Sequence, residues 1–164
     1  MLGSESNFFS SDKETLDYIK GEMVHFLKLH KTKTSVIDLY VEAYEFFIEH
    51  PKKFDGATVL KDVEIIPNLD IWAMIHDYMY IKFNVAVSWR LKYYADIIYT
   101  LEMERMGISY STTWVRFVLL LLISHLLFTP YELIKGKRIT KQQRIDFNKI
   151  INIFGVNNKN NKNK

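Results

Sequence analysis

The sequence contains no cysteine, and its 164 residues include only six glycines and three prolines. The absence of cysteine excludes a disulfide scaffold and thiolate metal sites, so any metal ion would be bound by oxygen or imidazole. Glycine and proline are residues that form turns, so a chain with few of them is not expected to make the many turns of a β protein. Hydrophobic residues make up 48% of the chain, which is enough for a packed core. These properties predict an all-α protein of one domain.

The sequence also lacks a strong excess of charge of either sign. Its 22 Lys and Arg residues and 19 Asp and Glu residues leave a net charge of +3. The excess lies largely in the tail, in Lys159, Lys162 and Lys164. A basic surface for specific nucleic-acid binding is therefore not expected. The first residues lack the basic and then apolar order of a secretory leader, so we expect no signal peptide.

No apolar run is long enough to span a bilayer as a helix. The longest, FVLLLLISHLLF at Phe117–Phe128, is bounded by Arg116 on one side and by Pro130 and Glu132 on the other. At ~1.5 Å per residue it reaches about 18 Å, against ~30 Å of hydrocarbon. We expect a core or interface helix that does not cross a membrane, with contact to a membrane surface as the alternative.

Apolar residues recur with helical spacing over most of the chain. The expected helices cover about 11–30, 35–50, 68–83, 88–106, 112–129 and 140–154, and a loop joins them at 52–67. The first two are expected to form a helical hairpin. The sequence thus predicts a flexible N-terminus at 1–10, a single helical domain at 11–155 and a disordered Asn/Lys tail at 156–164.

Local signals predict where several helices begin and end. A capping box begins at Ser11, and Thr140 with Gln143 forms another. Gly107 is expected to follow the end of the helix at 88–106. Pro130 is expected to end the apolar helix.

Two aromatic-rich helices carry polar residues that are expected to meet in the core. Asp96 lies among tyrosines and isoleucines at 88–106, and an unpaired buried carboxylate is costly. His76, at 68–83, is the expected partner if the two helices pack antiparallel. Asp96 would then bind one ring nitrogen of His76 and leave the other as a general base. Tyr80 shares the helix face of His76, whereas Asp77 is expected to face the preceding loop.

The segments HDYMY at 76–80 and LKYYAD at 91–96 resemble the phospholipase A2 superfamily, in its disulfide-free form from viral capsid proteins and small phage-encoded relatives. The resemblance implies that His76 is the general base, that Asp96 orients it, and that the Tyr80 hydroxyl supports the pair. It also implies that Asp77 binds Ca²⁺. It covers about residues 54–106, including Pro67, Asn68 and Asp70 before the motif and a remnant of the calcium loop at Phe54-Asp55-Gly56.

The function implied by this resemblance is calcium-dependent hydrolysis of a lipid ester by a virion-associated protein, with tailed phages as the expected source. Expected partners are other virion subunits, further copies of this chain or a phospholipid membrane surface, and the expected location is the virion or the host cytoplasm. The alternative is a catalytically silent structural or adaptor component of a virus particle. That alternative explains why no glycine lies between Gly56 and His76, where a calcium loop would need several.

Overall fold

The computed structural model describes residues 12–54, 69–123, 126 and 129–156. All regular elements in these ranges are helices, which confirms the all-α prediction. The chain divides into two compact units, Met1–Asp55 and Gly56–Lys164, and the domain expected at 11–155 covers both. The expected flexible N-terminus lies outside the described residues, as do most of the expected loop at 52–67 and nearly all of the expected tail.

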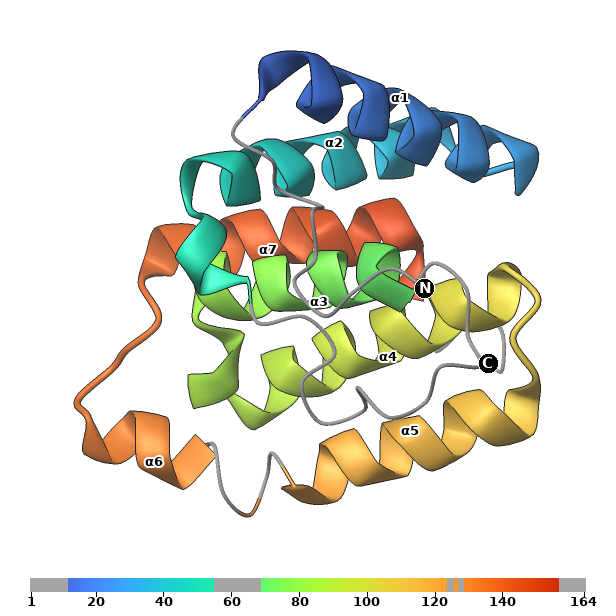
Figure 1. Cartoon of the computed structure of the whole chain (residues 1–164). Coiled ribbons are helices and arrows are strands. Elements are labelled where there is room, and N and C mark those ends of the chain that lie inside the picture. The colour runs from blue at the N-terminus through green and yellow to red at the C-terminus, as the bar shows by residue number, and fades with distance from the viewer. Residues whose placement is uncertain (1–11, 55–68, 124–125, 127–128, 157–164) are drawn as a thin grey trace. The chain divides into compact units, whose positions relative to one another are not determined.

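The first unit contains α1 (Lys13–Leu29), α2 (Thr34–Glu49) and the short 3₁₀ helix η2 (Pro51–Lys53). Helices α1 and α2 pack together as the predicted hairpin (Figure 1). The Tyr44 hydroxyl donates a hydrogen bond to the Leu16 carbonyl at 3.2 Å and so links the two helices. Their buried residues include Met23, Leu27, Tyr40, Ala43, Tyr44 and Phe47.

The beginnings of these two helices differ from the expected ones by a residue. Asp12 caps α1, because its carboxylate accepts the backbone N–H of Thr15 at 2.9 Å, whereas the expected cap Ser11 lies outside the described residues. Helix α2 begins at Thr34 after Lys33, which makes no side-chain cap. A carboxylate accepts an N–H as well as a hydroxyl does, so neighbouring Ser and Asp residues give competing cap signals.

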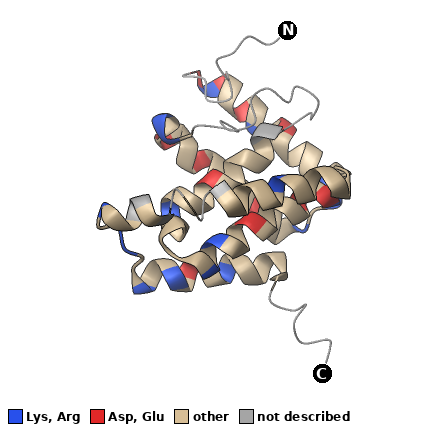
Figure 2. Ribbon diagram, turned by 90° about the horizontal axis from the view of Figure 1, so that it is seen from below, with Lys and Arg blue, Asp and Glu red and all other residues tan. Residues whose placement is uncertain are grey.

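The second unit contains α3 (Leu69–Phe83), the 3₁₀ helix η4 (Val85–Val87), α4 (Trp89–Arg105), α5 (Tyr110–Ile123), α6 (Thr129–Ile134) and α7 (Lys141–Phe154). Helix α4 packs against α3, α5 and α7, and Figure 1 shows it between α3 and α5. Charged residues of both signs occur together on α7 (Figure 2). Lys149 pairs with Asp146 there at 2.7 Å.

Helices α3 and α4 are joined by a short connection in which Asn84 adopts a left-handed conformation with φ 53°. The indole nitrogen of Trp72, early in α3, contacts the sulfur of Met106, just after α4, at 2.8 Å. The start of α3 therefore lies beside the end of α4. This direction brings the middle of α3, with His76, beside the middle of α4, with Asp96.

The predicted helix ends in this unit are right at three positions and wrong at one. Thr140 and Gln143 form the predicted capping box, and Gly107 and Gly155 follow helices with φ of 92° and 71°. Pro130, however, lies inside α6 and so does not end the helical structure there; α5 is described to Ile123, and only residue 126 is described between these two helices. Proline lacks an N–H that the first turn would leave unpaired, so it begins a helix as readily as it ends one.

Helix α5 packs against α4, and its residues differ in burial within the described part of the chain. Thr113 and Arg116 are buried, whereas Leu119 and Leu122 are 41% and 55% exposed. Within the described ranges, every helix falls short of the length and apolarity needed to cross a membrane.

Candidate functional site

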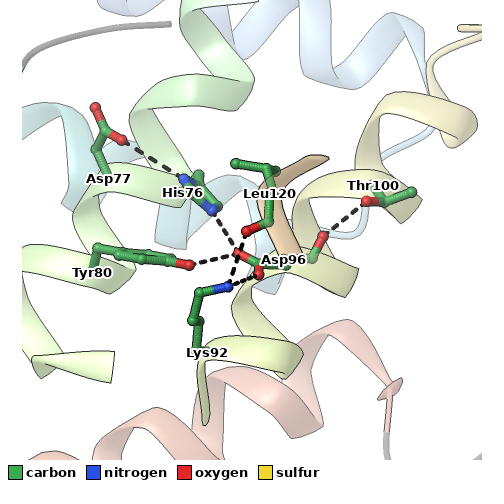
Figure 3. A network of polar contacts seen from close by, with 7 residues as sticks. All are labelled: His76, Asp77, Tyr80, Lys92, Asp96, Thr100 and Leu120. Carbon is green, nitrogen blue, oxygen red and sulfur yellow. Dashed lines mark hydrogen bonds and ion pairs between the residues drawn. The ribbon is translucent and has the colours of Figure 1, made fainter. Parts of the chain in front are cut away.

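The carboxylate of Asp96 is the centre of a polar cluster between α3 and α4 (Figure 3). Asp96 is fully buried, and its Oδ1 lies 3.0 Å from Nε2 of His76. The Tyr80 hydroxyl donates to the same oxygen at 2.7 Å, from one turn further along α3. The structure therefore brings the His76 ring and the Asp96 carboxylate within hydrogen-bond distance. This arrangement arises because α3 presents His76 and Tyr80 on one face, four residues apart.

Lys92 is the residue of this cluster that sequence reasoning missed. Its side chain is fully buried, and Nζ donates to Oδ2 of Asp96 at 2.5 Å. Nζ also lies 3.4 Å from the backbone carbonyl of Leu120, so the cluster extends to α5. The spacing of four residues between Lys92 and Asp96 was the available signal, since such pairs share a helix face. A buried charge is stabilised only when it is paired in this way.

Asp77 lies closer to His76 than expected. Its Oδ1 is 3.7 Å from Nδ1 of His76, although adjacent side chains on a helix leave the axis about 100° apart. This separation is within ion-pair range but longer than a hydrogen bond. Whether Asp77 also faces the preceding loop falls outside the described residues. Both ring nitrogens of His76 thus lie near a carboxylate.

These contacts set the pKa values of His76 and Asp96. Burial disfavours the charged imidazole, but the hydrogen bonds and charges of Asp77 and Asp96 outweigh it and raise the pKa of His76 to about 9. Burial alone would raise the pKa of Asp96, yet the hydrogen bond and charge of His76, together with Lys92, hold it below its usual range. At neutral pH protonated His76 therefore lies against the ionised carboxylate of Asp96.

The residues available to the expected Ca²⁺ are few. The described part of the chain contains no group of three or more His, Asp or Glu side chains that could hold a metal ion. Ca²⁺ takes six to eight oxygen ligands, so Asp77 alone does not fit it. Asp55, Gly56, Pro67 and Asn68 lie outside the described residues, as does the side chain of Asp70.

Comparison with protein-family models, curated proteins and solved structures finds no match for this chain. The resemblance to the phospholipase A2 superfamily thus stays a prediction from the two sequence segments. The contacts of His76, Tyr80 and Asp96 are a property of the structure itself. They form a histidine oriented by a buried carboxylate, which is an arrangement able to take a proton from water.

The protonation of His76 can be measured by NMR titration of its imidazole signals. We expect a midpoint near pH 9 in the intact chain, and a lower midpoint in Asp77→Asn, because that substitution removes a negative charge beside Nδ1. Since the folded pKa exceeds 6.5, protonated His76 stabilises the fold fully below that pH, and this stabilisation is lost as the pH rises through 9. Asp146→Asn, on α7, is the control. An unshifted midpoint in the intact chain would contradict the described contacts.

Proposed function

We propose that this protein is a phospholipase A2-like hydrolase of lipid esters in which His76 activates the attacking water. One observation carries the proposal: Asp96 binds Nε2 of His76 and the Tyr80 hydroxyl on a single oxygen. The carboxylate thereby fixes the ring and leaves Nδ1 as the nitrogen that can accept a proton. The His76 side chain retains 12% exposure, so the ring is not sealed from solvent.

The proposed reaction uses residues of the chain itself. Nδ1 of His76 takes a proton from water while the water oxygen attacks the ester carbonyl carbon. The bond from that carbon to the leaving alcohol oxygen then breaks, and the imidazolium returns the proton to this oxygen. Asp96 stabilises the imidazolium, and Lys92 and Tyr80 hold the Asp96 carboxylate in place.

Two conditions of this reaction are part of the proposal. A pKa of about 9 makes the neutral, proton-accepting form of His76 the minor form at pH 7, so turnover should increase toward alkaline pH. Dependence on Ca²⁺ and association with a virion follow from the family resemblance alone. Other virion subunits, further copies of this chain and a phospholipid surface remain the proposed partners.

A structural role in a virus particle is the second candidate function, and the balanced charges of the cluster favour it. Lys92 and protonated His76 neutralise Asp77 and Asp96, and hydrogen bonds from the cluster reach α3, α4 and α5. Such a network can fix how three helices pack without any catalysis. The protonated histidine would then be a permanent structural cation.

Fatty-acid release from mixed phospholipid vesicles distinguishes the two functions. We expect release that increases between pH 7 and pH 9, measured once with millimolar Ca²⁺ and once with chelator. A difference between these two arms would support a calcium requirement, and equal release would remove that part of the proposal. Negligible release at every pH, in both arms, would contradict hydrolysis and leave the structural role.

A further inference from the structure

Arg116 of α5 is a buried cation outside the contacts of the pair His76 and Asp96, which we call the dyad. Its side chain is 4% exposed, and Nη1 has no hydrogen-bond partner among the described residues. An unsatisfied donor on a buried guanidinium is costly, because both the charge and the N–H have lost their water. Such a group is stabilised when an anion binds to it.

Two contacts between α4 and α5 fix where Arg116 lies. Lys92, near the start of α4, donates to the carbonyl of Leu120, near the end of α5, at 3.4 Å. The hydroxyl of Thr113, near the start of α5, donates to the carboxylate of Glu104, near the end of α4, at 2.9 Å. Arg116 lies between Thr113 and Leu120, one turn before Leu120. It therefore faces the middle turns of α4, which carry the dyad.

Tyr99 connects Arg116 to the dyad. Its ring centroid lies 5.0 Å from that of His76, and only 4% of the residue is exposed. Burial raises the pKa of Tyr99, the charge and hydrogen bond of Arg116 lower it in part, and the charge of Asp77 raises it. The Tyr99 hydroxyl is thus close to Arg116 and within the field of Asp77, the carboxylate that lies beside Nδ1 of His76.

The charges around His76 favour an additional anion. Lys92 and His76 already lie against Asp77 and Asp96, so the guanidinium of Arg116 comes in addition to these pairs. The buried Glu102 pairs with Arg105 at 2.7 Å, and Glu104 accepts the Thr113 hydroxyl at 2.9 Å. A singly charged anion could pair with the guanidinium of Arg116.

We propose that Arg116 binds a phosphate group beside His76, the phosphodiester of the phospholipid substrate. This inference rests on the proposed function, because it names the part of the substrate that the site recognises. Guanidinium groups bind phosphate oxygens through paired N–H donors, and Nη1 supplies a donor that no described residue occupies. Arg116 would thereby align the ester with Nδ1 of His76.

The first test is binding of inorganic phosphate to the full chain, followed by NMR of the Arg116, Tyr99 and His76 side chains. We expect saturable shifts of these signals, and the same signals should respond to glycerophosphocholine if a head group binds there. Response to phosphate alone would indicate a site for the free ion and overturn the head-group assignment. Shifts confined to exposed lysines of α7, or no shifts, would overturn the site altogether.

The second test compares Arg116→Met and Arg116→Lys with Arg90→Met, an exposed arginine on α4. We expect Arg116→Met to abolish the phosphate shifts and to raise KM for phospholipid by at least tenfold, with partial recovery in Arg116→Lys. Arg90→Met should change neither. If Arg116→Met fails to fold, Arg116→Lys and the intact chain still decide the question.

The two proposals fail in different ways. Phosphate binding that depends on Arg116, without fatty-acid release, would support the anion site and contradict hydrolysis. Fatty-acid release with an unchanged KM in a folded Arg116 variant would support hydrolysis and overturn the role of Arg116.

Discussion

Asp96→Asn is expected to lower the free energy of unfolding by about 3–5 kcal/mol, the usual cost of removing one partner from a buried ion pair. The substitution leaves the fully buried Lys92 ammonium without its counter-ion and removes the charge that stabilises protonated His76. Urea denaturation at pH 7 measures the change.

Asp146→Asn is the matched control, because Asp146 is also paired with a lysine on its own helix but is partly exposed. Exposed pairs contribute about 0–1 kcal/mol, so this variant should stay close to the intact protein. Adding Lys92→Met to Asp96→Asn should recover much of the lost stability, since the unpaired ammonium is removed. Equal decreases in the free energy of unfolding of Asp96→Asn and Asp146→Asn would contradict a buried ion pair between Lys92 and Asp96.

His76→Gln is expected to reduce fatty-acid release by about 10²–10⁴-fold, the range typical of losing a general base. Glutamine can still donate a hydrogen bond to Asp96, so the fold should persist, although the charge of His76 is lost. Initial rates on mixed phospholipid vesicles at pH 9, with circular dichroism to verify folding, provide the measurement.

His25→Gln serves as its control, because His25 is an exposed histidine of α1. This variant should keep full turnover and the same dependence on pH. A folded His76→Gln variant with the rate of the intact protein would remove His76 from the mechanism. Equal losses in the two histidine variants would indicate a general effect on the protein and contradict a specific role.

The sequence by itself determined the all-α class and the positions of most helices, but not the separate helix α6. Helical periodicity and local caps such as Thr140 with Gln143 act within a few residues, so they can be recognised without the fold. The contact between His76 and Asp96 could also be predicted, because a carboxylate in an apolar helix requires a partner and few residues could supply one.

Only the tertiary structure decided which cations are buried. Lysine and arginine usually extend into water, so the sequence does not place Arg116 inside, and the spacing of Lys92 and Asp96 indicates a shared helix face without showing that both are buried. Their burial depends on how α4 packs against α5, where the Leu120 carbonyl and the Asp96 carboxylate meet one ammonium. The pKa of the proposed base is therefore a property of the assembled helices, because it depends on charges brought together from separate parts of the chain.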